Sequence, residues 1–190
     1  MFLFMKNFFV GPVNITSEVI PGSKRDEERA KMFSLQQYSS KEIWIVAGEL
    51  DPEFYNKDYA EMIRKKFTES PNFRLNILFS KDDTMSIDER IKLVYHQNQE
   101  LCELLKDGAF EGRLSLFLIK KRPVNHFGIV DNSILIEKIH EPNKERDVLI
   151  VKNYQTLVEK YKRYFIKLIH DNSDVCRLRF SQFTKFKNIA

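Results

Sequence analysis

Short apolar runs and longer periodic segments alternate along this chain. The runs are rich in β-branched and aromatic residues and predict strands at 41–48, 73–80, 114–119, 125–130, 134–139 and 147–151. Segments in which apolar residues recur every three or four positions predict helices at about 23–38, 51–70, 86–105 and 153–170. Residues 15–22 are expected to form a loop or an edge strand. The pattern is typical of an α/β protein.

The order of these elements predicts how the sheet is built. A strand, a helix and a strand over 41–80 make a βαβ unit, which requires a parallel strand pair. Residues 125–139 instead predict an antiparallel hairpin that turns at Asp131-Asn132-Ser133. We therefore expect a mixed β-sheet flanked by helices in one domain over 1–190, with a core at about 23–170, an apolar arm at 1–22 and a basic, aromatic tail at 171–190.

Polar residues mark the expected helix starts. Ser23 and Asp26 match a capping box, and so do Ser86 and Glu89. Asp51 followed by Pro52 is expected at the first turn of the second helix, and Asn153 is expected to cap the last one.

The composition is that of a globular protein, with 43% hydrophobic and 31% charged residues. Cys102 and Cys176 form no C-x-x-C pair, so neither a disulfide framework nor a zinc site is expected, and a reducing, cytoplasmic setting is the default. The apolar N-terminus, MFLFMKNFFVG, has no basic region before it and no A-x-A-like cleavage site after it. It is expected to form a strand or a docked arm, with membrane association as a minor alternative.

The net charge of +4 is unevenly distributed. Residues 151–190 carry nine Lys or Arg against three acidic residues, which suggests an anionic partner such as nucleic acid. The ordinary alternative is a solvated surface, with Phe180, Phe183 and Phe186 docking the tail onto the body. The candidate nucleic-acid-binding residues are Lys160, Arg163, Lys167, Arg177, Arg179 and Lys185.

The stretch from Leu114 to Pro142 holds the candidate chemistry. Hairpin pairing is expected to place residue 126 opposite about residue 139, so that His126 and His140 lie close together. Two imidazoles so placed can serve as nucleophile and general acid, or as metal ligands. Further candidate ligand-binding residues are Lys120, Lys121, Arg122, Asp131 and Glu137. The alternative is that the histidines are ordinary polar residues at strand ends.

Other catalytic signatures are missing from the sequence. It contains no P-loop, no G-x-G-x-x-G, no G-x-S-x-G and no H-E-x-x-H motif. The histidine spacing offers no third metal ligand, so neither a metal nor a cofactor is expected.

Four segments together resemble one subunit of the phospholipase D superfamily: KEIWIVAGELDPEFYN, RLNILFS, LSLFLIKKRPVNHFGIVDNSILIE and NYQTLVEKYKRYFIKLIH. The resemblance covers about residues 30–170 and centres on HFGIVD followed by ILIE, which resembles the strand pair carrying the family's H-x-K-x-x-x-x-D motif. Family members with the intact motif are metal-independent phosphodiesterases in which the His attacks phosphorus and the Lys holds the phosphate. Two such motifs meet across a dimer or an internal repeat. This chain has one copy, so the resemblance implies a homodimer.

The chain departs from the family motif at two positions. With the motif anchored on Asp131, its His position falls on Val124 and its Lys position on His126. A valine has no nucleophilic atom, so the family's chemistry is not expected here. The family's later Gly-Ser-x-Asn region falls on residues 138–141 and matches poorly.

Three functional hypotheses follow. The first is a phospholipase D-like domain with a degenerate site that binds a phosphate-bearing ligand, such as nucleic acid, without efficient catalysis. The second is a divergent metal-independent phosphodiesterase or nuclease that uses His126 and His140. The third is a regulatory or assembly module with a vestigial pocket.

Overall fold

The computed structural model describes residues 14–81, 84–140, 145–184 and 186, without the side chains of 138–140 and 145. The strands are β1 (Thr16–Ile20), β2 (Glu42–Ala47), β3 (Arg74–Ser80), β4 (Leu114–Ile119), β5 (Phe127–Val130), β6 (Ser133–His140), β7 (Glu145–Lys152) and β8 (Val175–Arg177). The helices are α1 (Arg25–Tyr38), α2 (Lys57–Glu69), α3 (Ile87–Gln97), α4 (Gln99–Glu103), α5 (Gln155–His170) and α6 (Phe180–Thr184), with short 3-10 turns at Leu104–Lys106 and Gly108–Phe110.

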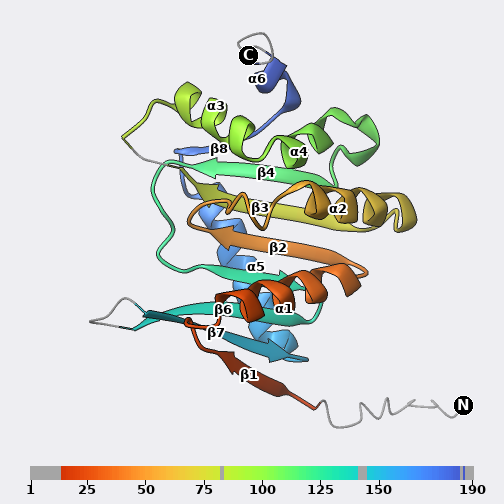
Figure 1. Ribbon diagram of the computed structural model, residues 1–190, viewed down its shortest axis with the longest axis vertical. Coiled ribbons are helices and arrows are strands. Elements are labelled where there is room, and N and C mark those ends of the chain that lie inside the picture. The colour runs from red at the N-terminus through yellow and green to blue at the C-terminus, as the bar shows by residue number, and fades with distance from the viewer. Residues whose placement is uncertain (1–13, 82–83, 141–144, 185, 187–190) are drawn as a thin grey trace, which may run out of the picture.

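One eight-stranded sheet runs through the molecule in the order β1-β7-β6-β5-β2-β3-β4-β8 (Figure 1). Strands β2, β3 and β4 are parallel neighbours, and every other pairing is antiparallel. The predicted mixed α/β sheet is confirmed. Because β2, β3 and β4 point the same way, their carboxyl ends share one edge of the sheet, where α/β proteins commonly bind ligands. We call this the carboxyl edge.

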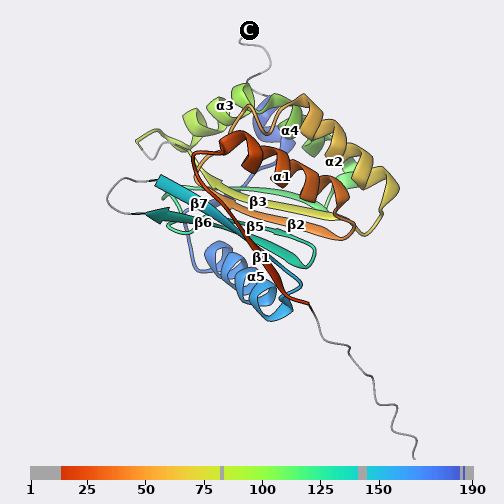
Figure 2. The ribbon, with the colours of Figure 1, turned by 60° about the horizontal axis from the view of Figure 1, so that its bottom comes forward.

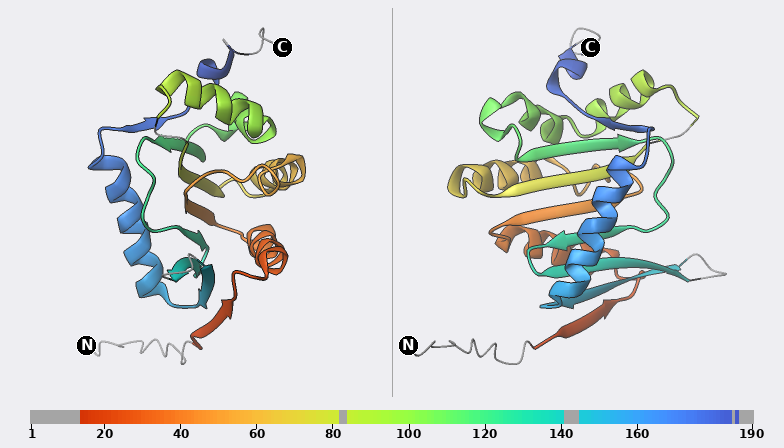
Figure 3. Two further views of the ribbon diagram at one scale, coloured as in Figure 1. Left: turned by 60° about the vertical axis from the view of Figure 1, so that its left-hand side comes forward. Right: turned by 180° about the vertical axis from the view of Figure 1, so that it is seen from behind.

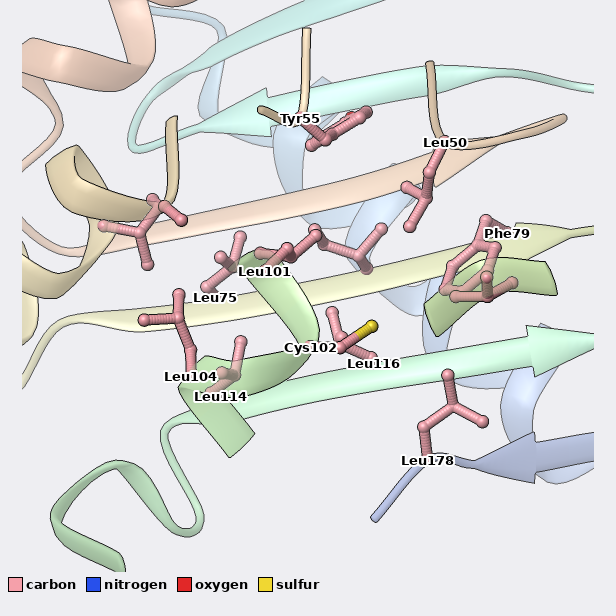
Figure 4. Close-up of a cluster of buried hydrophobic side chains, with 14 of the residues drawn as sticks. Leu50, Tyr55, Leu75, Phe79, Leu101, Cys102, Leu104, Leu114, Leu116 and Leu178 are labelled. Carbon is pink, nitrogen blue, oxygen red and sulfur yellow. The ribbon is translucent and has the colours of Figure 1, made fainter. Parts of the chain in front are cut away.

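Helices cover both faces of the sheet. Helices α1 to α4 lie on one face, and α5 crosses the other alone (Figures 2 and 3). The larger buried cluster lies between α2, α3, α4 and the parallel strands. In Figure 4, Leu101, Cys102 and Leu104 of the α4 region lie among Leu75, Leu114 and Leu116 of β3 and β4. A second cluster packs α5 onto β2 and β5, with Trp44 and Phe165 edge to face at 5.0 Å.

Only one of the predicted helix caps is confirmed. The Ser86–Glu89 capping box is present at α3. The others were wrong: α1 begins after Lys24 without a side-chain cap, α2 is capped by Asn56, and α5 follows Tyr154. Because α2 begins six residues later than Asp51, that carboxylate is available to bind side chains of α1.

Two further predictions concern the ends of the chain. The edge-strand alternative for 15–22 is confirmed by β1, whereas the expected arm over residues 1–13 lies outside the described residues. The aromatic tail docks, because Phe183 is buried and stacks on Tyr95 with ring centroids 5.2 Å apart. Strand β8 was not predicted. Within the described residues, none of the helices combines the length and the apolar character that crossing a membrane requires.

Candidate functional site

A cleft of about 420 Å³ opens at the carboxyl edge beside the end of β2, and we call it the β2 cleft. Helix α1 and residues 48–55 form one wall, and the start of β5 with parts of β6 and β7 forms the other. Its charged lining residues are Arg25, Glu28, Arg29, Glu49, Asp51, Arg122, His126, Glu137 and Arg146. Four arginines, four carboxylates and one histidine therefore converge on one cleft.

Arg122 lies directly on the backbone at the end of β2. A Cβ atom added to Gly48 would come within 2.7 Å of Nε and Nη2 of Arg122, so the guanidinium occupies the space that any other residue at 48 would fill. The Gly48 carbonyl is itself held by the backbone N–H of Ser80 at 2.9 Å. The Gly48 backbone beneath Arg122 is therefore fixed. The Arg122 guanidinium makes no ion pair with the described residues.

We expect Gly48→Ala to displace Arg122 with little loss of stability. The new methyl group would meet the end of a flexible side chain, which can move, and no backbone atom is among its three nearest neighbours. The free energy of unfolding should change by less than about 1 kcal/mol, whereas affinity for a phosphate-bearing oligonucleotide should fall about as far as in Arg122→Met. Denaturant unfolding and fluorescence anisotropy measure the two quantities. Unchanged affinity would show that the position of Arg122 on Gly48 is unimportant.

His126 is held by the neighbouring strand. Its Nδ1 hydrogen-bonds to Oε2 of Glu137, whose Oε1 accepts a hydrogen bond of 2.6 Å from Arg146. The hydrogen bond from His126 holds the pKa of Glu137 below its usual value against the opposing effect of burial, and the charges of His126 and Arg146 act in the same direction. The other ring nitrogen, Nε2, is buried and has no hydrogen-bond partner among the described residues. The imidazole is thus oriented through Nδ1 alone.

Most other charges in the β2 cleft are paired. Asp51 accepts hydrogen bonds from Arg29 at 2.6 Å and from Arg25 at 3.2 Å, and Glu49 pairs with Lys81 at 2.6 Å. Glu28 forms no ion pair within the described part of the chain. Burial raises the pKa of the Glu28 carboxyl, Arg146 offsets part of that rise, and Glu137 adds to it. Among the described lining residues of the β2 cleft, Glu28 and Arg122 are the two acidic or basic side chains without an ion-pair partner, since His126 is bonded to Glu137.

The hairpin register differs from the prediction. The turn has two residues, with Val130 paired to Ser133, and the backbone N–H of Glu137 donates to the carbonyl of His126. Glu137, rather than residue 139, is therefore opposite His126. His140 ends β6 three residues further on, and its side chain lies outside the described residues.

The remaining candidates around the hairpin lie apart from the β2 cleft. Neither Lys120 nor Lys121 is among its lining residues. Asp131 lies at the opposite end of β2 and accepts hydrogen bonds from the backbone N–H groups of Ser40, Lys41 and Glu42. This carboxylate ties the hairpin turn to the strand before it, so its hydrogen-bonding capacity is already used by the protein.

The basic C-terminal candidates are divided between surfaces. Lys160, Arg163 and Lys167 are exposed on α5, across the sheet from the β2 cleft (Figure 3). Lys162, which the helical pattern also places on the outer face, is instead paired with Glu42. Arg177 and Arg179 lie near β8, where Arg177 donates to Ser115 Oγ at 3.2 Å, and Lys185 lies outside the described residues. They do not form one continuous surface with the β2 cleft.

Several cleft residues did not stand out in the sequence. Arg25 and Arg29 lie on α1, whose apolar stripe is weak in the sequence. Arg146 lies near the start of β7, far along the chain from α1. A usable signal was present in Gly48 to Asp51, a polar segment directly after a buried strand, which is where α/β sheets place ligands. In the described part of the chain, no three His, Cys, Asp or Glu side chains are arranged to hold a metal ion.

Comparison with known proteins gives matches in structure but none in sequence. No protein-family profile matches the sequence, and no curated protein matches it significantly. Solved structures do match. Nuc of Salmonella typhimurium, a phospholipase D family member, superposes with a TM-score of 0.58 at 12% identity, over 87% of this chain and 99% of Nuc. The chain has a phospholipase D-like fold.

Two larger proteins also match this chain in structure. TrmBL2, an archaeal chromatin protein described with a novel mode of DNA binding, matches 84% of this chain with a TM-score of 0.59 at 15% identity. The phosphatidylserine synthase of Haemophilus influenzae matches 88% with a TM-score of 0.57 at 12% identity. The chain spans 55% of the first protein and 41% of the second.

Proposed function

We propose that this phospholipase D-like domain binds a phosphate-bearing ligand, such as nucleic acid, in the β2 cleft without efficient catalysis. The proposal rests on two side chains that line the same cleft. The Arg122 guanidinium has no ion-pair partner in the described structure, and His126 Nε2 has no hydrogen-bond partner there. Guanidinium groups bind phosphate through two parallel hydrogen bonds, and an imidazole N–H is a further type of donor that phosphate oxygens accept. The similarity to a DNA-binding chromatin protein supports nucleic acid as the ligand.

The proposal of weak or no catalysis depends on Val124. When the family motif is anchored on Asp131, Val124 falls at the nucleophile position, and it is 85% exposed. An apolar side chain in solvent supplies neither a nucleophile nor a general acid. The proposal also includes a homodimer, since the chain has one copy of a motif that the family uses in pairs.

The test is binding of a labelled single-stranded oligonucleotide, followed by fluorescence anisotropy at several salt concentrations. Wild-type affinity should fall steeply with salt, because phosphate contacts release counterions. Arg122→Met should weaken binding about tenfold through loss of a charge-assisted hydrogen-bond pair. The matched control is Lys167→Met on α5, which should change affinity less than about twofold. If Lys167→Met is the more damaging variant, the ligand binds the α5 face and the proposal is wrong.

One observation favours a second candidate, a divergent phosphodiesterase. Glu137 orients His126 through Nδ1 and leaves Nε2 without a partner among the described residues, as a nucleophilic or basic imidazole requires. This candidate predicts metal-independent hydrolysis of bis(p-nitrophenyl) phosphate, so the rate should persist in the presence of a chelator. The rate should disappear in His126→Ala, and a rate that survives this substitution excludes His126 chemistry.

A further inference from the structure

We infer a second oxyanion site, built on the buried Arg90 of α3, in a separate cleft between the start of α3 and β8. This cleft has a volume of about 550 Å³ and lies at the ends of β4 and β8. It shares no lining residue with the β2 cleft. We call it the α3 cleft.

The main evidence is the state of the Arg90 side chain. Arg90 is only 4% exposed, yet its Nε and Nη1 atoms have no hydrogen-bond partner in the described part of the chain. It also makes no ion pair with any described residue. A guanidinium removed from water without a partner is strongly unfavourable, and proteins normally pair such a charge. An anion bound in the cleft that Arg90 lines would supply the missing acceptors when the guanidinium turns towards it.

The surroundings suit a phosphate-type oxyanion. Lys120 lines the same cleft, and its backbone N–H is fixed by the carbonyl of Asp174 at 3.2 Å. Ser173 and Ser86 also line it. Ser86 is committed to the α3 capping box, so its hydroxyl is not needed for the inference. One guanidinium, one ammonium and one hydroxyl together match the hydrogen-bonding needs of a phosphate group.

The protein itself offers one rival partner for Arg90. The Asp174 carboxylate also lines the α3 cleft, is exposed, and forms no ion pair with the described residues. If Asp174 turned onto Arg90 in solution, no ligand would be required. The experiment therefore has to separate a bound oxyanion from an internal ion pair.

The test compares thermal unfolding in sodium chloride and in inorganic phosphate at equal ionic strength. Phosphate at ten times its Kd should raise the wild-type Tm by about 4 °C. Arg90→Met should remove the part of that rise that comes from the α3 cleft, which is the whole rise when Arg122→Met is also present. Its Tm in chloride should exceed that of wild type, because an apolar chain of similar length replaces an unpaired buried charge. Lys120→Met, an exposed substitution that preserves the fold, should remove most of the part that comes from the α3 cleft.

Two further variants decide the interpretation. Arg122→Met should keep the rise that depends on Arg90, so failure at the β2 cleft and failure at the α3 cleft are distinguishable. Asp174→Asn should strengthen the response to phosphate by removing a repelling charge. The inference is overturned if Arg90→Met responds to phosphate as wild type does, or if Asp174→Asn and Arg90→Met both lower the Tm in chloride.

A competition experiment then identifies the source of the oxyanion. The Arg122→Met protein is saturated with inorganic phosphate and titrated with a single-stranded oligonucleotide. Displacement that depends on Arg90 identifies a polynucleotide phosphate as the ligand. Absence of displacement, with the phosphate response intact, identifies a free phosphate or a small phosphorylated molecule.

Discussion

Replacing Asp131 by alanine should lower the free energy of unfolding by about 3 kcal/mol, or about 9 °C in Tm. The carboxylate accepts hydrogen bonds from three consecutive backbone N–H groups and from Ser39 Oγ at 2.9 Å, and all of these would lose their partner. Asp131 also has a φ of 51°, a conformation that alanine disfavours. Chemical denaturation followed by circular dichroism measures the loss.

Asp131→Asn is the matched control, because asparagine tolerates positive φ and keeps one acceptor oxygen. It should cost less than alanine, and the cost should depend on pH. Burial favours the neutral acid, but the backbone N–H groups of Ser40 and Glu42, with Ser39 and Lys41, outweigh it and hold the pKa of Asp131 below its usual value. The charged form therefore stabilises the fold above about pH 4, and this contribution is lost as the pH falls through the lowered pKa. A cost for Asp131→Asn that does not vary with pH would contradict this account.

Replacing Gly22 by alanine should destabilise the protein by a similar amount, about 3 kcal/mol. A Cβ atom at this position would lie 1.8 Å from the backbone carbonyl oxygen of Arg146, so the connection between β1 and α1 would have to move away from β7. That movement would also strain the hydrogen bond of 3.2 Å from the Gly22 N–H to Asp147 Oδ1. Thermal unfolding measures the effect.

The control for Gly22 is Gly108→Ala, where an added methyl group meets no atom within 4 Å. It should change the free energy of unfolding by less than about 0.5 kcal/mol. The contact at Gly22 also brings the start of α1, with Arg25, towards Arg146 at the β2 cleft. Gly22→Ala should therefore weaken oligonucleotide binding as well. A Gly22→Ala protein as stable as Gly108→Ala would show that the two segments are not in this close contact.

The fold was predictable from the sequence wherever burial imposes a clear pattern of apolar residues. The runs at 41–48, 73–80 and 114–119 became the parallel centre of the sheet because they are buried on both faces. Strand β8 was not predicted, since none of its three residues is fully buried and they pair with β4 from a distant part of the chain. The predicted helix cap at Asp51 was wrong because this side chain binds Arg29 instead.

The site was predictable only in part. Arg122, His126 and Glu137 were singled out from one stretch of sequence, and the structure brings all three to the β2 cleft. The role of Asp131 was not visible, because its partners lie about 90 residues away. Arg90 was equally hidden, since an arginine within a helical pattern is normally exposed, and its burial depends on how α3 packs near β4 and β8.

A crystal structure of the protein grown with a short single-stranded oligonucleotide tests the central claim most directly. The account predicts a phosphate group in the β2 cleft, with its oxygens within hydrogen-bonding distance of the Arg122 guanidinium and His126 Nε2. The phosphodiester bond should be intact, because Val124 supplies no nucleophile. An empty β2 cleft with the strand bound along α5, or a cleaved strand covalently attached to His126, would contradict the account.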